Sequence, residues 1–330
     1  MPAEWEPHRA TWIAWPHNRD DWPGKFAPIP WVYAEIVRHL HRSERVRIIT
    51  TDPARPARLL ARAGVDLSRI DFFPFPTDRS WTRDYGPMFV RRGRRLAIHD
   101  WRFNGWAKYS NWRRDRQVAR RAAQKLGVPL IEPGIVLEGG AIDVNGRGTL
   151  LTTEECLLSN TQQRNPGLSR AGLEAILARH LGVRHFLWLR RGIAGDDTHG
   201  HIDDIARFAG PSTVVAAVEE DPADPNHAPL RENLELLRSM QDQDGRPLRV
   251  VPLPMPAPLY FDGRRLPASY ANFYIANNIV LVPTFDDPND RLALATLAEL
   301  FPGRQVAGIH SVDLVWGLGT LHCLTQQEPA

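Results

Sequence analysis

Four hairpin signals recur along this chain at similar intervals, and they constrain its fold more than any other feature. Each is a tight-turn motif between two strand-like runs, and the turns are centred on Gly93, Asn145-Gly146, Gly210-Pro211 and Asn277-Asn278. The paired runs span residues 87–98, 141–152, 205–218 and 272–283, and the turns lie 53, 64 and 67 residues apart. Asn-Gly is a strong hairpin signal because both central residues of such a turn adopt positive φ. The recurrence predicts a repeated structural unit.

The intervals between the hairpins carry helical patterns and further short strands. Apolar residues at helical spacing predict helices around residues 33–40, 173–181 and 294–301. Runs rich in β-formers predict strands at residues 46–51, 70–75, 185–189 and 249–253. This alternation indicates an α/β fold, and the repeated hairpin-plus-helix unit predicts a closed, radial architecture. We expect a fifth unit to pair residues 10–15 with residues 320–325.

The bulk properties narrow the class of protein. No linker or low-complexity stretch divides the chain, so a single domain covering residues 1–330 is expected. The formal net charge is only +3 and the basic residues are scattered, which argues against nucleic-acid binding. No apolar run approaches the roughly 18 residues that cross a bilayer. With two cysteines and no secretory signal pattern, we expect a cytoplasmic protein without disulfides.

Two segments beside the hairpins combine acidic, aromatic and glycine residues. In the first, Asp84 stands between Trp81 and a Gly-Pro turn, which suits either a carboxylate in an aromatic-walled pocket or a turn-forming acid. In the second, Glu138 precedes Gly139-Gly140. Consecutive glycines allow a backbone to approach a ligand closely, although a bulge beside a solvated Glu fits the pattern equally well.

Residues 195–204 hold four acids and two histidines within ten positions. In a strand, His199, His201 and Asp203 would share one face, as the ligands of a zinc hydrolase do. The same residues also suit an acid–base histidine beside a carboxylate that orients a cation. Purely structural packing is the weaker interpretation, because burying several unpaired charges is costly.

The C-terminal segment places Cys323 in a short, polar, glycine-preceded run that reads as a strand. A thiolate is a strong nucleophile when a neighbouring histidine or a cationic substrate lowers its pKa. The alternative is a buried, unreactive thiol, and that interpretation fits Cys156 better than Cys323.

Taken together, these segments resemble the agmatine deiminase family of guanidino-modifying enzymes, which is related to bacterial peptidylarginine deiminases. The similarity runs through blocks 1–7, 15–18, 81–87, 137–140, 148–158, 164–166, 198–204 and 322–327. It implies a five-fold pseudosymmetric α/β propeller of ββαβ-type repeats, and no metal or organic cofactor. It also implies that Asp84 and Asp203 grip a guanidinium, that His201 is the acid–base group and that Cys323 is the nucleophile. The residues expected to line the pocket are Trp81, Glu138, Gly140 and Asp197.

The reaction implied by the resemblance is hydrolysis of agmatine to N-carbamoylputrescine and ammonia. Arginine or peptidyl-arginine are alternative substrates, and a zinc hydrolase built on His199, His201 and Asp203 or a non-catalytic binding module are alternative functions. The chain departs from the family pattern at Asp143, Leu318 and Thr320, which we expect near the pocket. The family often forms dimers, although no residue pattern here specifies an oligomeric state.

Overall fold

All four predicted hairpins form antiparallel strand pairs in the computed structural model, which describes residues 1–330. Gly93 and Gly146 adopt φ values of 61° and 69° at two of the turns, as the turn chemistry requires. The pairs are β4 (Met88–Arg92) with β5 (Arg95–His99), β7 (Asp143–Val144) with β8 (Thr149–Thr153), β10 (Ala206–Gly210) with β11 (Thr213–Val218), and β15 (Tyr274–Ile275) with β16 (Ile279–Thr284).

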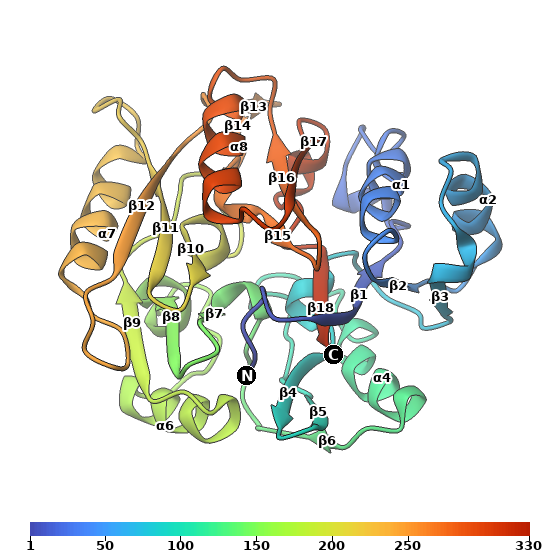
Figure 1. The fold of residues 1–330 in the computed structure, drawn as a ribbon, viewed down its shortest axis with the longest axis horizontal. Helices are drawn as coiled ribbons and strands as arrows, with labels where there is room; N and C mark the ends of the chain where they lie inside the picture. Colours follow the sequence, from blue (N-terminus) through green and yellow to red (C-terminus); the bar gives the residue numbers. More distant parts are fainter.

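Each hairpin gains a third, parallel strand after a helical crossover, because parallel neighbours cannot be joined by a tight turn. The crossover helices lie on the outside of the molecule (Figure 1). They are α4 (Val118–Leu126) before β6 (Leu130–Ile131), α6 (Arg170–Leu181) before β9 (His185–Leu189), α7 (His227–Ser239) before β12 (Arg249–Pro254), and α8 (Asn289–Leu300) before β17 (Gln305–His310).

The two ends of the chain form the remaining large sheet, in the order β18-β1-β2-β3. The expected pairing of the termini is therefore confirmed, with β1 (His8–Ala14) antiparallel to β18 (Thr325–Pro329). The other two strands, β2 (Arg45–Ile49) and β3 (Ile70–Phe73), follow α1 (Ile29–Leu40) and α2 (Ala54–Arg62).

The predicted strand at residues 320–325 is wrong, because β18 begins only at Thr325. The Thr325 hydroxyl donates to the Leu321 carbonyl at 2.8 Å, and the Thr325 amide donates to the His322 carbonyl at 3.1 Å. These bonds close a turn before the strand starts. Cys323 consequently lies in a turn rather than in a strand.

Short elements fill the space between the sheets. The helical ones are α3 (Thr82–Tyr85), α5 (Glu154–Leu158) and the 3₁₀ turns η1 (Arg19–Asp21), η2 (Leu67–Arg69), η3 (Asp115–Gln117), η4 (Gly139–Ala141), η5 (Ile202–Asp204), η6 (Tyr270–Asn272) and η7 (Leu314–Gly317). The strands β13 (Tyr260–Phe261) and β14 (Arg264–Arg265) form a separate ribbon. None of the helices is both long and apolar enough to cross a bilayer.

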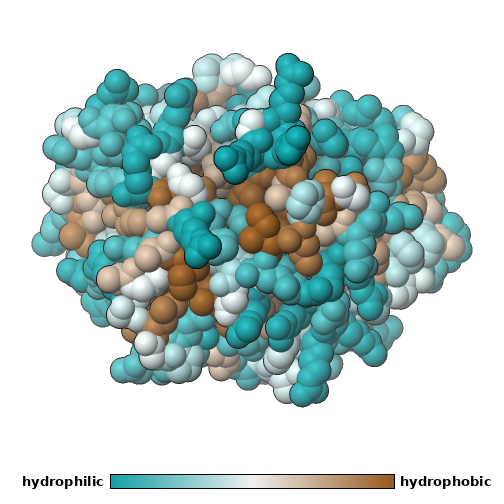
Figure 2. Space-filling model, turned by 90° about the horizontal axis from the view of Figure 1, so that it is seen from below, coloured by the Kyte–Doolittle hydropathy of each residue, from teal (hydrophilic) through white to brown (hydrophobic).

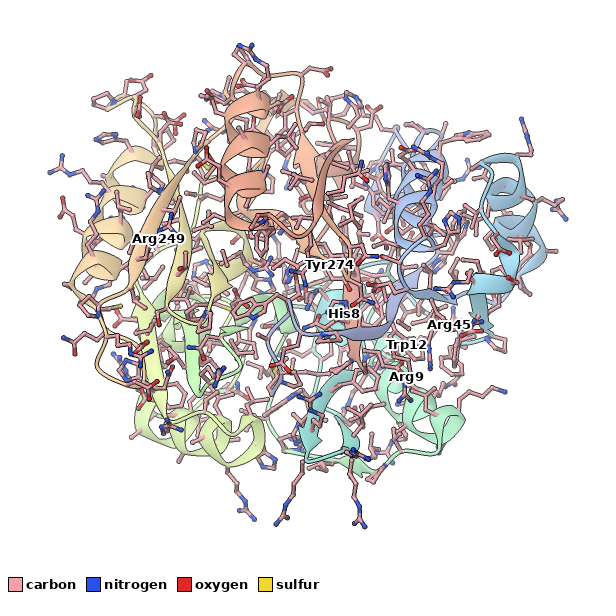
Figure 3. All side chains as sticks on the ribbon, viewed as in Figure 1. His8, Arg9, Trp12, Arg45, Arg249 and Tyr274 are labelled. Atoms are coloured by element: carbon pink, nitrogen blue, oxygen red, sulfur yellow. The ribbon has the colours of Figure 1, made fainter.

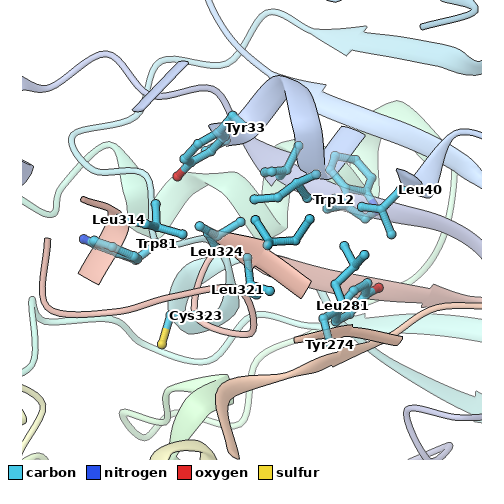
Figure 4. Close-up of a cluster of buried hydrophobic side chains, with 14 of the residues drawn as sticks. Trp12, Tyr33, Leu40, Trp81, Tyr274, Leu281, Leu314, Leu321, Cys323 and Leu324 are labelled. Atoms are coloured by element: carbon cyan, nitrogen blue, oxygen red, sulfur yellow. The ribbon is translucent and has the colours of Figure 1, made fainter. Parts of the chain in front are cut away.

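The largest apolar cluster contains 53 buried residues and includes Trp12, Tyr33, Trp81 and Cys323 (Figure 4). His8 and Tyr274 lie near the middle of the molecule, whereas Arg249 lies on the outer strand β12 (Figure 3). The face seen from below is mostly hydrophilic, with apolar residues near its centre (Figure 2). The fold is thus a mixed α/β arrangement of small sheets.

Candidate active site

A cavity of about 270 Å³ opens where several of the sheets meet, and Cys323 and Asp84 line it. His201 Nδ1 lies 3.9 Å from Asp84 Oδ1 and 3.9 Å from Asp203 Oδ1. The Cys323 sulfur lies 3.8 Å from Asp203 Oδ2. The four residues predicted to be catalytic are therefore brought together, although they come from three distant stretches of sequence. We call Asp84, His201, Asp203 and Cys323 the floor cluster.

The Cys323 turn is built against Trp81 and depends on close contacts by two glycines. A Cβ atom on Gly319 would lie 2.9 Å from Trp81 and 3.2 Å from the Cys323 sulfur, and one on Gly317 would lie 2.7 Å from Trp81. Figure 4 shows the sulfur pointing away from the apolar cluster. Burial, together with Asp203, Asp204 and Asp84, raises the pKa of the thiol well above its usual value. The thiol is therefore neutral while the cavity is empty.

Asp84 is fixed by hydrogen bonds to both of its carboxylate oxygens. Oδ1 accepts from the Gly140 amide at 3.0 Å, and Oδ2 accepts from Trp106 Nε1 at 2.9 Å. Burial raises the pKa of Asp84 to about 6, aided by Asp203 and Glu138 and opposed by His201. The carboxylate is thus held in one orientation but lacks a cationic partner in direct contact.

Gly140 is required for the close approach of these groups. A Cβ atom at this position would lie 2.5 Å from His201 Nδ1 and 3.0 Å from oxygens of Asp84 and Asp203. The structure thus shows close approach of side chains to Gly140 rather than approach of its backbone to a ligand. Gly140 does not line the cavity, so its expected place in the pocket lining is wrong. It packs behind the floor cluster.

His201 and Asp203 keep polar atoms without partners, although both residues are almost completely buried. Both ring nitrogens of His201 and Oδ1 of Asp203 make no hydrogen bond. Burial by itself lowers the pKa of His201, but Asp84 and contacts with Cys156 and Glu138 outweigh it and raise this pKa well above its usual value. Buried polar atoms are normally satisfied, so Oδ1 of Asp203 is suited to a ligand that brings N–H groups and positive charge, whereas the N–H groups of protonated His201 are suited to proton transfer.

Glu138 supports His201 from the side away from the cavity, so the expectation that it lines the pocket is wrong. Its Oε1 accepts from Arg164 Nε at 3.0 Å, and its Oε2 lies 3.7 Å from His201 Nε2. Burial by itself raises the pKa of Glu138, but Arg164 and His201 outweigh it and lower this pKa to about 2. An ionised Glu138 helps to keep His201 protonated.

Trp81 and Asp197 line the cavity as predicted. Trp81 packs against Trp22 with ring centroids 5.2 Å apart. Asp197 accepts from the Tyr109 hydroxyl at 2.6 Å and pairs with Lys108.

The strand predicted for His199, His201 and Asp203 is wrong, and the three side chains do not meet. His199 adopts a φ of 65°, and its Nε2 contacts the Ser159 hydroxyl at 3.1 Å. Residues 202–204 form η5 rather than a strand. The backbone reversal before Gly200 turns His199 away from His201, so the proposed zinc triad is not assembled.

Two other sets of side chains place potential metal ligands within 4.8 Å of one another: Glu138, Cys156 and His201, and Asp203, Asp204 and Cys323. In the first set Glu138 already pairs with Arg164, and in the second Asp204 accepts from Asn272 at 2.9 Å. Cys156, interpreted from sequence as an unreactive buried thiol, thus lies beside the histidine of the floor cluster.

Sequence reasoning missed Asn272, which organises the Cys323 turn. Its amide Nδ2 donates to the Cys323 sulfur at 3.1 Å, and its Oδ1 accepts from the His322 amide at 3.0 Å. The Thr320 hydroxyl donates to the same oxygen at 2.8 Å. Asn272 marked only the start of a predicted hairpin, so no local signal pointed to this role. Thr320, one of the family departures, stabilises the turn through it.

The other two departures have different positions. Leu318 lines the cavity and adopts a φ of 68°, a region that favours glycine. Asp143 does not line the cavity, so its expected place near the pocket is wrong. It pairs with Arg207 at 3.1 Å, in a group of buried charges that also contains Glu4 and Arg83. We call Glu4, Arg83, Asp143 and Arg207 the central ion cluster.

Comparisons with known proteins agree with this geometry. Residues 1–329 match the family model of the Porphyromonas-type peptidyl-arginine deiminases. Agmatine deiminase from Stutzerimonas stutzeri is 38% identical over 356 residues, covering 100% of this chain and 95% of that protein. A candidate arginine deiminase from Porphyromonas gingivalis superimposes with a TM-score of 0.92 at 40% identity, covering 100% and 97% of the two chains. Agmatine deiminase from C. jejuni with substrate bound gives a TM-score of 0.91 at 30% identity, covering 100% and 96%.

These similarities extend over the full length of the chain and over the segments that build the floor cluster. The family model and the relatives carry deiminase activities, and the floor cluster supplies a thiol, an imidazole and two carboxylates beside one cavity. The chain therefore belongs to the Porphyromonas-type peptidyl-arginine deiminase family.

Proposed function

We propose that this enzyme hydrolyses agmatine to N-carbamoylputrescine and ammonia, with Cys323 as a covalent nucleophile. The observation that carries the proposal is the position of the Cys323 thiol. It lies 3.8 Å from Asp203, in a site where Asp84 has no arginine or lysine partner and Oδ1 of Asp203 makes no hydrogen bond. A guanidinium supplies the missing positive charge and several N–H donors in one plane.

Substrate binding is proposed to use Asp84 and Asp203. The free Oδ1 of Asp203 and the fixed carboxylate of Asp84 accept N–H groups of the guanidinium. Such charge-assisted pairs hold the central carbon near the sulfur. His201 lies against both carboxylates, so it faces the nitrogen that leaves.

The bound cation also activates the nucleophile. In the empty site, the neighbouring acids hold the pKa of Cys323 high, so the thiol is protonated. A guanidinium between these acids offsets their charge and favours the thiolate. The reactive form therefore arises when substrate is present.

The chemical steps follow from these positions. The thiolate adds to the guanidinium carbon, forming a C–S bond and a tetrahedral adduct. His201, which is protonated, gives its proton to one –NH2 group, and the C–N bond breaks to release ammonia and leave a thiouronium. Neutral His201 then takes a proton from water, and the hydroxide adds to the same carbon. The C–S bond then breaks while the hydroxyl group of the adduct loses its proton to solvent, which releases the neutral ureido product and restores the thiolate.

Charges on the cavity wall favour a substrate with a second cation. Asp20 lines the cavity, is exposed, and makes no side-chain hydrogen bond or ion pair. Asp21 already pairs with Arg79 at 3.0 Å, and Asp197 with Tyr109 and Lys108. We therefore assign the distal ammonium of agmatine to Asp20.

One feature favours free arginine as a second candidate substrate. Arg264, in β14, also lines the cavity without an ion pair. A guanidinium there could bind an α-carboxylate. Replacement of Asp20 should therefore weaken the use of agmatine, and replacement of Arg264 should weaken the use of arginine.

The experiment is a panel of agmatine, arginine, a peptidyl-arginine and methylguanidine, with ammonia release measured for wild type and variants. We expect the highest kcat/KM for agmatine and no activity in Cys323→Ala. Asp20→Asn should raise the KM for agmatine about two- to fivefold, the effect expected from the loss of one exposed charge pair, with little effect on arginine. Activity of Cys323→Ala with any of these guanidines contradicts the covalent route, and a preference for arginine that Arg264→Gln abolishes favours the second candidate.

We also propose that the five larger sheets form a single-domain, five-fold pseudosymmetric propeller that acts in the cytoplasm without a cofactor. Four of them are three-stranded and share the sequence hairpin, crossover helix, parallel strand, and the fifth combines the two chain ends. This common connectivity supports the pseudosymmetry.

A further inference from the structure

The N-terminal segment reaches the floor cluster through one buried glutamate. Glu4 is 3% exposed, and the two chain ends lie close together, where β1 pairs with β18 (Figure 1). Its carboxylate pairs with Arg83 Nη2 at 3.1 Å and Arg207 Nη2 at 3.0 Å, and it accepts from the Ile275 amide at 2.9 Å. Glu4 is therefore rigidly placed, and it lies outside the cavity that holds the substrate.

His322 connects Glu4 with Asp203. Its Nδ1 lies 2.7 Å from Asp203 Oδ2, and its Nε2 lies 2.9 Å from Glu4 Oε2. An ionised carboxylate can only accept hydrogen bonds, so each of the two ring nitrogens has to carry a proton. The imidazole between these two carboxylates is consequently a cation. The backbone amide of His322, bonded to Asn272, fixes the position of the ring.

This arrangement determines the state of Asp203. Oδ2 is occupied by His322, and only Oδ1 remains free for a ligand. Burial by itself raises the pKa of Asp203, but the hydrogen bond and charge of His322, with His201 and Arg207, outweigh it and lower this pKa. The facing acids Asp204 and Asp84 oppose ionisation of Asp203, whereas the Cys323 thiol donates to its Oδ2 at 3.8 Å and favours it. Without a cationic His322, Asp203 would share the high pKa of its neighbours.

We infer that Glu4 is a positioning residue: through a cationic His322, it keeps Asp203 ionised with one oxygen turned toward the guanidinium. The inference rests on the proposed function, since it gives Asp203 the task of binding that cation. It assigns the N-terminal segment a part in substrate binding, besides its part in stability.

A pair of alkylating reagents tests the inference. Chloroacetamidine is a planar cation, chloroacetamide is its neutral analogue, and each loses chloride as the Cys323 sulfur forms a C–S bond. An ionised Asp203 accelerates the first reagent but not the second. We expect Glu4→Gln to lower the amidine-to-amide rate ratio at Cys323 about tenfold, because Asp203 is then no longer held ionised with Oδ1 turned toward the cation.

The controls separate positioning from structural damage. Glu6→Gln, in the same segment, removes a surface ion pair with Arg91 but keeps an amide oxygen that can accept from the Ala3 amide, so it should leave the ratio unchanged. His322→Gln should lower the ratio as much as Glu4→Gln, and it keeps the test available if Glu4→Gln does not fold. Because Glu4 acts through His322, the double variant should show no further loss.

Three outcomes are distinguishable. A ratio that falls in both single variants, with no additional fall in the double variant, supports the inference. Equal slowing of both reagents, or additive losses, overturns it and leaves Glu4 a structural role. A wild-type enzyme whose Cys323 shows no preference for the amidine overturns the proposed function instead.

Discussion

The floor cluster and the central ion cluster are both buried and both charged, but they are built differently. In the central ion cluster each acid faces arginine: Glu4 pairs with Arg83 and Arg207, and Asp143 pairs with Arg207. In the floor cluster, Asp84 has no arginine or lysine partner and Asp203 keeps a free oxygen. Buried charges are stable when paired. The contrast shows where the fold leaves positive charge to be supplied by a ligand.

The largest effects should come from removing one charge in each cluster. Asp84→Asn should lower kcat/KM about a thousandfold, roughly 4 kcal/mol, because the guanidinium loses a buried partner. Arg207→Met should instead lower the free energy of unfolding by about 3–5 kcal/mol, because it leaves Asp143 without its buried cationic partner and removes one of the partners of Glu4. Steady-state kinetics and urea denaturation of both variants check the contrast. If Asp84→Asn destabilises the protein more than Arg207→Met does, the division between the clusters is wrong.

Gly140→Ala should disturb the floor cluster without altering any charge. The added methyl group would lie 2.5 Å from His201 Nδ1, so the ring has to move away from Asp84 and Asp203. We expect a loss of about 1–3 kcal/mol in stability, the usual cost of overpacking, together with a 10- to 100-fold lower kcat. Gly303→Ala, at a site where the added methyl group meets nothing within 4 Å, serves as the control for glycine replacement itself. Full activity in Gly140→Ala would contradict the tight packing described above.

One acid of each cluster, Asp84 and Glu4, should contribute to stability with opposite dependence on pH. The pKa of Asp84 is raised to about 6 in the folded protein, so its folded form binds a proton more tightly than the unfolded chain. Stability should therefore fall by up to about 3 kcal/mol as pH rises from 4 to above 6. Glu4 has a pKa well below its usual value, since Arg207, His322 and Arg83 outweigh its burial, so its stabilisation is lost only as pH falls below about 4.

Denaturation of wild type at pH 4.5 and pH 8 measures the first of these effects, and Asp84→Asn should reduce the difference. Activity should have the opposite pH dependence to stability. We expect kcat/KM to drop as pH falls through about 6, because protonated Asp84 no longer attracts the cation. Activity unchanged between pH 5 and pH 7 would exclude Asp84 as an ionised binding group.

The smallest effect is expected at Leu318, on the cavity wall. A φ of 68° costs an L-residue about 1–2 kcal/mol of stability. Replacement by glycine removes this strain, but glycine also has more conformational entropy in the unfolded chain, which offsets part of the gain. Leu318→Gly should raise stability by no more than about 1 kcal/mol, seen as a small rise in Tm. A decrease would mean that packing of the Leu318 side chain outweighs the backbone strain.

The sequence was informative where the signal is local. Turn residues such as Asn145-Gly146 predicted the hairpins because their chemistry is set within a few positions. Local patterns were misleading at residues 320–324. The sequence there is typical of a strand, but the Thr325 hydroxyl bonds to the Leu321 carbonyl and closes a turn. The local pattern was misleading again at His199, whose left-handed φ breaks the alternation assumed for a strand.

The floor cluster was predicted through the family resemblance, whereas its supports were not. Asn272 contacts Cys323 across 51 positions, and Glu4 contacts His322 across 318 positions. Neither residue belongs to a motif with a recognisable chemical role. Contacts over such separations depend on how the sheets are arranged, and this arrangement is known only from the structure.

The central claim is that the Cys323 sulfur meets a guanidinium held by Asp84 and Asp203 beside His201. Acid-quenched mass spectrometry of the enzyme during turnover of agmatine tests it most directly. The account predicts a peptide in which Cys323 carries agmatine less one ammonia, absent from Cys323→Ala. Rapid release of N-carbamoylputrescine by Cys323→Ala, or an adduct on Cys156 instead, would contradict it.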